Sequence, residues 1–342
     1  MKMRYPYPVL FDTDEKLWTQ YIKDYNVPLQ MTSVDHCRYA FDNFDWFNKY
    51  LLTMQFANDC IFELHDGNTQ EFININKQAT SRCIDVIGQL DSYRKFNEME
   101  LPKHDEKLFD GIQFSKGLDI YKPHNDGKKF VSIDLTAANL QSMNYFEALS
   151  GLTNISKFPY TKTIDFQGIL NRAGEVGDYR RLKYLAMSKR IRQVIFGNLN
   201  PKRQQAAEKY ITEELILRLL DPELTNLKPE DFYGYTTDEI ILNYTGKVAE
   251  LFDGMHNTVH KLNEGRKFID VHVEIFELKQ LKPYDFWVKK SNGCGIVADI
   301  KKVPVVYFLQ VLRYINDESV QHEDMEFLYE TNVARFVQPL WK

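Results

Sequence analysis

The sequence predicts a mixed α+β fold on three observations. Apolar residues recur at helical spacing through roughly the first 105 residues, short β-forming segments appear only after them, and the later helices and strands do not alternate regularly. A regular alternation of strand and helix would instead indicate a parallel sheet between helical layers. We therefore expect helices first, then a strand, two helices and a strand, and finally a β-ribbon and a helix.

The composition is that of a folded protein. Of the 342 residues 44% are hydrophobic and 14% aromatic, and the net charge of -5 excludes a uniformly basic nucleic-acid coat. The four cysteines form no CxxC pair, which argues against a zinc module and a disulfide framework. No apolar run reaches the roughly 20 residues that span a bilayer, and the first residues lack the apolar core of a secretory signal. We expect no membrane partner and a cytoplasmic location.

Residues 1–105 are expected to form a helical N-terminal region. Apolar side chains recur at helical spacing from Trp46 to Phe56 and again from Ile73 to Leu90. Turn-forming residues 65–68 (HDGN) follow the first run, and Pro102 follows the second. This region is expected to be a scaffold.

The first strand is predicted after the turn signal at Asp126-Gly127. Residues 130–135 (FVSIDL) are mostly apolar and include one acid, Asp134, close to their end. Residues 137–149 then have the pattern of a helix. The sequence thus predicts a buried strand with a carboxylate at its tip.

Residues 172–203 form the most basic stretch of the chain. Nine basic residues stand against two acidic ones, a net charge of +7, so the remainder of the chain carries -12. The basic residues are Arg172, Arg180, Arg181, Lys183, Lys189, Arg190, Arg192, Lys202 and Arg203. Such a stretch can bind phosphates by charge alone. Asn200-Pro201 is expected to begin a helix that continues through Leu220, because Pro is favoured in the first turn.

A second acid-bearing segment, residues 233–242 (YGYTTDEIIL), follows that helix. A helix over 247–262, strands over 268–278 and 295–300, and an apolar helix from Val303 through Tyr314 complete the prediction. If the two acid-bearing strands are neighbours, Asp134 and Asp238 lie side by side. Two carboxylates can hold a pair of Mg²⁺ ions, which prefer oxygen ligands and can promote phosphoryl transfer.

Three segments resemble the motifs of the family A (Pol I-like) nucleotide polymerases. Residues 134–141 (DLTAANLQ) resemble motif A, and residues 237–242 (TDEIIL) resemble motif C, in which Thr237 stands in the place of the usual His. Residues 188–197 (SKRIRQVIFG) resemble the fingers helix. The likeness covers roughly residues 128–245 and is that of a divergent, minimal polymerase of viral or mobile-element type.

The resemblance implies roles for individual residues. Asp134 and Asp238 would bind Mg²⁺, or Mn²⁺ in its place, and Glu239 would act beside them. Lys189 and Arg192 would neutralise the triphosphate, and Phe196 would stack on the nucleotide. We expect all three side chains on one exposed helix face that is directed toward the acids. Asn139 stands where the family has its sugar-discriminating Glu, so we expect ribonucleotides to be accepted at least as minor substrates. The remaining basic residues, Arg172, Arg180, Arg181, Lys183, Lys202 and Arg203, would contact nucleic acid.

These inferences divide the chain into a polymerase-like palm sheet (106–155 and 223–262), a helical fingers-like insert (156–222), the helical region 1–105 and a C-terminal β-ribbon and helix region (263–342). The expected function is template-dependent nucleotidyl transfer, with a nucleic-acid template and nucleoside triphosphates as partners. Two alternatives remain open. One is a non-catalytic nucleic-acid-binding or assembly protein that uses the basic insert, and the other is a metal-dependent nuclease that uses the same acids.

Overall fold

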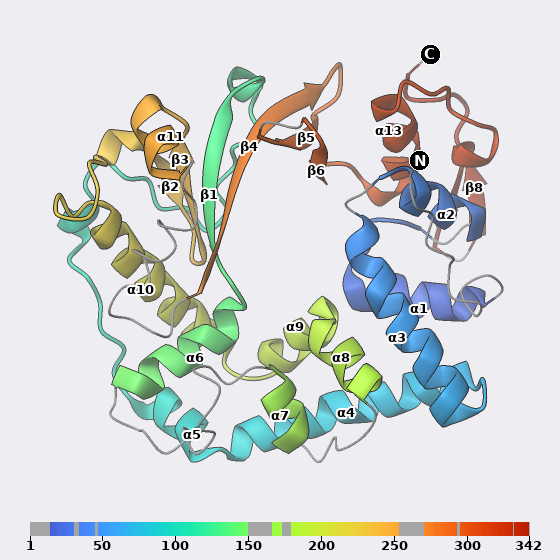
Figure 1. Cartoon of the computed structure of the whole chain (residues 1–342), viewed down its shortest axis with the longest axis horizontal. Helices are drawn as coiled ribbons and strands as arrows, with labels where there is room; N and C mark the ends of the chain where they lie inside the picture. The colour runs from blue at the N-terminus through green and yellow to red at the C-terminus, as the bar shows by residue number, and fades with distance from the viewer. Residues whose placement is uncertain are drawn as a thin grey trace. The chain divides into compact units, whose positions relative to one another are not determined.

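The computed structural model describes residues 14–30, 34–44, 47–149, 166–172, 179–252, 270–292, 295–330 and 332–341 (Figure 1). The chain divides into two compact units. The first contains residues 1–83, 170–195 and 299–342, and the second contains residues 84–169 and 196–298. None of the helices in the described part of the chain combines the length and the apolar character needed to cross a bilayer.

The first unit is helical apart from a C-terminal β-ribbon. Its elements are α1 (Glu15–Tyr25), α2 (Val34–Asn43), α3 (Asn48–His65), most of α4 (Thr69–Gln89), α8 (Tyr179–Met187), most of α9 (Lys189–Gly197), α13 (Phe308–Ile315), β7 (Glu326–Tyr329) and β8 (Asn332–Arg335). The two helices predicted in the N-terminal region are confirmed as α3 and α4. The turn between them begins at Asp66, which adopts a left-handed conformation with φ of 45°, and continues through Gly67 with φ of 80°.

The second unit is built on one sheet. Its strands lie in the order β2-β3-β1-β4-β5-β6, and each of the pairs β2–β3, β3–β1, β1–β4 and β4–β5 is antiparallel. The strands are β1 (Lys129–Leu135), β2 (Phe232–Tyr235), β3 (Glu239–Asn243), β4 (Val271–Leu281), β5 (Phe286–Ser291) and β6 (Val297–Lys301), of which β6 lies across the division between the units. The predicted strand at 130–135 is confirmed, whereas segment 233–242 forms a hairpin of two strands. Strand β5 was not predicted.

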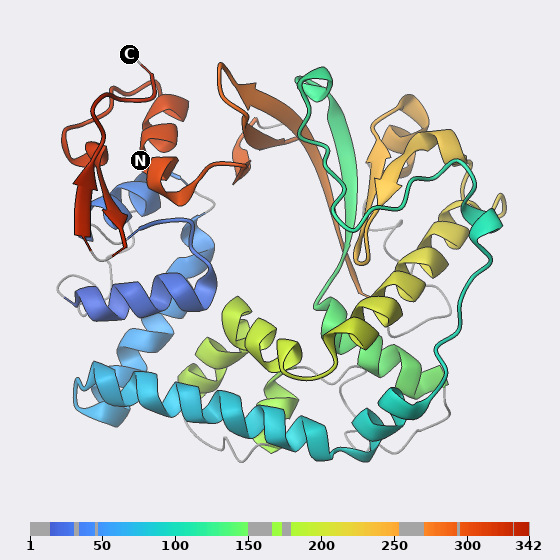
Figure 2. The same cartoon turned by 180° about the vertical axis from the view of Figure 1, so that it is seen from behind.

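Helices complete the second unit. They are α5 (Asp91–Glu98), α6 (Ala138–Leu149), α10 (Pro201–Leu219) and α11 (Gly246–Phe252), while α7 (Phe166–Arg172) lies across the division between the units. Helix α10 begins as predicted, because the Asn200 side chain accepts a hydrogen bond from the Arg203 amide and Pro201 occupies the first turn. It packs against α6 and β3, and Figures 1 and 2 show α6 and α10 side by side.

These contacts correct the predicted division of the chain. Residues 263–342 do not form a separate C-terminal region, because β4 pairs with β1 along seven residues and places the β4–β5 ribbon in the central sheet. The predicted insert 156–222 is also divided, since α10 belongs to the second unit with the sheet and α8 belongs to the first. The long strand β4 pairs with β1 along one edge and with β5 along the other.

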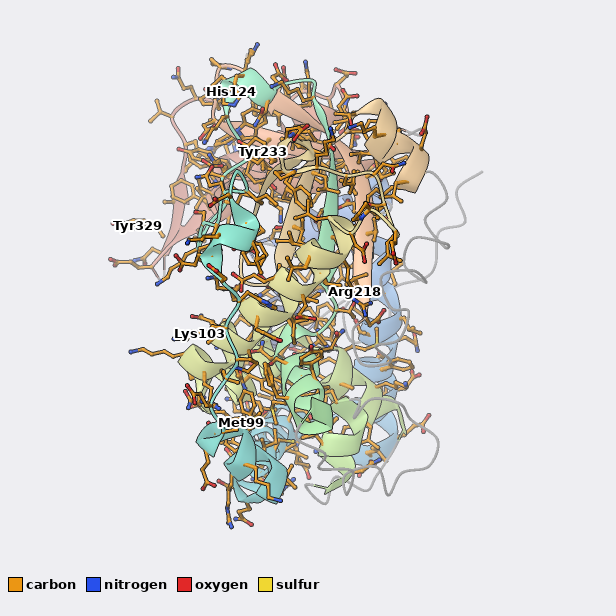
Figure 3. All side chains as sticks on the ribbon, turned by 90° about the vertical axis from the view of Figure 1, so that its left-hand side faces the viewer. Met99, Lys103, His124, Arg218, Tyr233 and Tyr329 are labelled. Carbon is orange, nitrogen blue, oxygen red and sulfur yellow. The ribbon has the colours of Figure 1, made fainter. Side chains whose placement is uncertain are left out.

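The two faces of the sheet differ in character. On one face, Val131, Ile133 and Leu135 of β1 are all buried. The opposite face is apolar at one end, where Phe130, Ile241, Phe276, Leu278 and Trp287 form a cluster with Ile120. Tyr233 packs against this cluster. Figure 3 labels Tyr233, with His124 near one end of the unit and Met99 near the other. The remaining part of this face is polar and carries Asp134 and Glu239.

Candidate acidic site

The register of β1 and β3 brings two carboxylates together. Asp134 pairs directly with Glu239, and the Leu135 amide donates a 2.8 Å hydrogen bond to the carbonyl of Asp238. This bonding pattern makes Asp134–Glu239 a pair without mutual backbone hydrogen bonds, for which the Cα atoms are typically about 4.5 Å apart and the side chains are close. Both side chains therefore project from the same face of the sheet, next to Asp238 in the chain.

The neighbouring positions on this face are also polar. Ser132, which is 4% exposed, donates a 2.6 Å hydrogen bond from its hydroxyl to the Glu239 carboxylate. On the other side of β1, His272 pairs with Asp134 and Glu274 pairs with Ser132. The Glu274 carboxylate lies 3.7 Å from the ammonium group of Lys289 on β5. The polar half of the face thus collects acidic groups from three adjacent strands.

Asp238 lies in the two-residue turn between β2 and β3. The Thr236 amide closes this turn with a 2.8 Å hydrogen bond to the Glu239 carbonyl. The hydroxyls of Thr236 and Thr237 donate to Asp238 Oδ1 at 3.1 and 3.3 Å. The Asp238 carboxylate is therefore held by its own turn, and Glu239 is the acid that the register places opposite Asp134.

Helix α10 adds an acid that the sequence analysis missed. Thr212 donates a 2.8 Å hydrogen bond from its hydroxyl to the Thr237 carbonyl, which fastens the turn to the middle of α10. One helical turn earlier, Glu208 is only 6% exposed. Burial, and secondarily the charge of Asp238, raise the pKa of Glu208 to about 8. The signal was present in the sequence as Gln204, Glu208 and Thr212, which are polar residues spaced by four along the helix.

A further polar residue lies on the same face of α10. Gln204, one turn before Glu208, is 1% exposed, and among the described residues neither its amide nitrogen nor its amide oxygen has a hydrogen-bond partner. Buried polar side chains are hydrogen-bonded in the large majority of cases. Gln204 is therefore an exception that a ligand would explain.

The site offers the ligands that hard cations prefer. Its donors are carboxylate, hydroxyl and amide oxygens, which suit Mg²⁺ and Mn²⁺. Within the described ranges, no three His, Cys, Asp or Glu side chains are grouped closely enough to hold a metal ion. The predicted placement of the two acid-bearing strands beside each other is confirmed. The role of Asp134 and Asp238 as metal ligands stays a prediction.

The predicted nucleotide-binding face of α9 is wrong in part. Phe196 is 4% exposed, and its ring packs against Phe166 with the centroids 6.5 Å apart, so it fills a core instead of presenting a surface. Arg192 is half-buried, and its Nη1 donates a 2.6 Å hydrogen bond to the Ala186 carbonyl at the end of α8. Lys189 is exposed. Lys189 and Arg192 belong to the first unit and the acids to the second, so the expected approach of this face to the acids stays a prediction.

One of the predicted nucleic-acid contacts also has another role. The guanidinium of Arg203 stacks 5.1 Å from the Phe96 ring centroid and donates to the carbonyls of Phe96 and Met99, where it satisfies the end of α5. Two nitrogens of its guanidinium are therefore engaged within the protein, and its contact with nucleic acid stays a prediction.

The other predicted binding residues remain open. Lys202 is exposed, Lys183 is half-buried, and Arg181 donates to the Asn76 side chain at 3.4 Å. The side chains of Arg172 and Arg180 lie outside the described residues. Asn139 is half-buried in the first turn of α6, five residues after Asp134.

Comparison of the chain with protein-family models, with curated proteins and with solved structures finds no match. A function is therefore inferred from the residues themselves. The strongest of the observations is the direct pairing of Asp134 with Glu239 on neighbouring strands.

Proposed function

We propose that the protein is a template-dependent nucleotidyltransferase that uses divalent cations bound at the acidic end of the sheet. Asp134, Asp238 and Glu239 hold the cations, with Mg²⁺ as the natural ion and Mn²⁺ as a substitute. The substrates are nucleoside triphosphates and a nucleic-acid template. The observation that carries the proposal is the direct pairing of Asp134 with Glu239, beside Asp238, on antiparallel strands.

Electrostatics supports a cation at this place. Like charges directly opposite each other on neighbouring strands are destabilising, and Asp134 and Glu239 are opposed in this way. A divalent cation between them converts the repulsion into two attractive contacts. When bound, such ions activate an attacking hydroxyl and neutralise the charge that develops on a leaving pyrophosphate.

The surrounding residues support a rigid arrangement of these acids. The Ser132 hydroxyl orients Glu239, and the hydroxyls of Thr236 and Thr237 orient Asp238. The side chain of Gln141 donates to the carbonyls of Thr136 and Asp270 and accepts from the Asp270 amide, which ties β1 to β4 just beyond Asp134. A preorganised site of this kind favours chemistry that depends on the positioning of charge.

The binding-protein alternative would use only part of the basic stretch. It requires exposed cationic groups, which Lys189 and Lys202 offer, whereas the guanidinium groups of Arg192 and Arg203 are engaged with backbone carbonyls. A metal-dependent nuclease would use the same acids as the proposed transferase. The experiment below distinguishes the three activities.

The test is extension of a fluorescently labelled primer annealed to a DNA or an RNA template, with Mg²⁺ or Mn²⁺ and with deoxy- or ribonucleoside triphosphates. We expect incorporation that follows the template sequence. Asp134→Asn and Asp238→Asn should each reduce the rate by about 100-fold or more, since a bound metal contributes several kcal/mol to transition-state stabilisation. Glu213→Gln is the control, because Glu213 is a buried acid of α10 whose partners are Tyr235 and Lys209.

The possible results separate the three functions. Primer shortening without nucleoside triphosphates, if abolished by the same two variants, would identify a nuclease. Salt-sensitive binding without any covalent change, and unaffected by either variant, would identify a binding protein. Incorporation that survives the loss of both Asp134 and Asp238 carboxylates would refute the assignment of the site.

A further inference from the structure

The β2–β3 turn and helix α10 bring two carboxylates near each other, and a buried amide lies one helical turn away. Asp238 lies in the turn, and Glu208 lies on the face of α10 to which that turn is fastened by Thr212. Gln204 occupies the preceding turn of the same helix face. Residues four apart on a helix are surface neighbours, and helical side chains lean toward the N-terminus of the helix, so Glu208 leans toward Gln204.

We propose that Glu208, together with Asp238 and the side-chain oxygen of Gln204, forms a binding site for a divalent cation between α10 and the β2–β3 turn. This site deepens the proposed function, on which it rests, because it assigns α10 as the source of ligands for one of the cations. The Asp134–Glu239 pair would serve the other cation.

Three independent observations support this site. Glu208 is 6% exposed, yet it lies close enough to Asp238 for the two charges to interact. The buried amide of Gln204 has no partner in the part of the chain that the structure describes, although a buried amide ordinarily satisfies its hydrogen bonds. All three side chains supply oxygen, the donor that Mg²⁺ and Mn²⁺ prefer. A cation would satisfy both carboxylates and the amide oxygen at once.

Neighbouring residues of α10 show why a purely structural role does not explain Glu208. Glu213 is equally buried, but it accepts a 3.0 Å hydrogen bond from the Tyr235 hydroxyl and lies 3.2 Å from the ammonium group of Lys209. Glu208 instead faces another acid. A buried carboxylate that faces a like charge is costly to keep unless a cation or a proton compensates it.

The experiment measures Mn²⁺ binding to the full chain by electron paramagnetic resonance of the free ion, without nucleotide or nucleic acid. We compare the wild type with Glu208→Gln, Asp134→Asn and the control Glu213→Gln, and we test displacement by Mg²⁺. Glu208→Gln should weaken one class of Mn²⁺ site by at least 10-fold and leave the class that depends on Asp134 in place. Asp238→Asn is a second variant that reaches the same site from the turn, and it should weaken the same class.

The outcomes distinguish this inference from the proposed function. Wild-type Mn²⁺ affinity in folded Glu208→Gln protein would overturn the cation site, even if primer extension still required Asp134. Loss of one Mn²⁺ class in Glu208→Gln without any nucleotide incorporation by the wild type would uphold the cation site and refute the transferase. Equal weakening by Glu213→Gln would also overturn the inference, because it would show a general response to changes in α10.

Discussion

Replacement of Glu208 by Gln should stabilise the protein, and more so at alkaline pH. The ordinary pKa of a glutamic acid is 4.5, and in the folded protein that of Glu208 is raised to about 8. Between these values the folded state holds a proton that the unfolded state has lost, so the free energy of unfolding falls as the pH rises. The decrease begins above the unfolded pKa and is complete above the folded one.

The size of the effect follows from the difference in pKa. One pKa unit corresponds to about 1.4 kcal/mol, so the wild type should lose about 3 kcal/mol from this group by pH 7 and about 5 kcal/mol by pH 9. Glutamine has the shape of the protonated acid and cannot ionise. Glu208→Gln should therefore match the wild type near pH 4.5 and exceed it progressively at higher pH.

Urea denaturation at pH 5, 7 and 8.5, in metal-free buffer, measures this difference directly. Glu213→Gln retains Glu208 and should retain the wild-type dependence on pH. An equal gain at pH 5 and pH 8.5 would refute the reasoning, because it would show that the substitution acts through packing and not through ionisation. No gain at any pH would place Glu208 in a more hydrated environment than the structure gives it.

Three other changes have definite expected results. Arg203→Ala should lower the free energy of unfolding by about 2 kcal/mol, because it removes charge-assisted hydrogen bonds at the end of α5. Lys202→Ala, which changes an exposed side chain, should have little effect. Thermal denaturation compares the two variants, and equal stability would contradict the capping role of Arg203. Gly234→Ala should cost about 2 kcal/mol or more in the same assay, since φ is 155° and a Cβ atom would lie 2.8 Å from the Gln113 carbonyl oxygen. Ribonucleotides should be incorporated at least slowly in primer extension, because Asn139 stands in place of a bulky acid, and strict exclusion would refute that expectation.

Local signals in the sequence predicted several elements correctly. The turn after Asp126-Gly127 and the apolar run that follows it predicted β1, and Asn200-Pro201 predicted the start of α10. These elements are specified by residues close together in the chain. The pairing of the two acid-bearing strands was a further assumption. The register confirms it and sets Glu239, not Asp238, directly opposite Asp134.

The features that the sequence did not reveal have a common physical origin in contacts between distant parts of the chain. The sequence shows the charge of Arg203, but it does not show that the carbonyls of α5, about a hundred residues earlier, would take up its donors. The spacing of Phe196 is helical, but its burial depends on Phe166. Glu208 acquires its significance only because the β2–β3 turn, some thirty residues later, carries Asp238 to the same place.

The opposition of Asp134 and Glu239 remains the strongest reason to regard this end of the sheet as functional. Nearby positions on the same face of β1 and β3 are filled by Phe130 and Ile241, so the fold readily accommodates apolar residues there. A like-charged pair in their place lowers stability, and the hydroxyl of Ser132 donates a hydrogen bond to one of its members. Residues that reduce stability are characteristic of functional sites, where a ligand can supply a favourable interaction. A divalent cation supplies a positive charge between the two acids, with the oxygen coordination that both carboxylates provide.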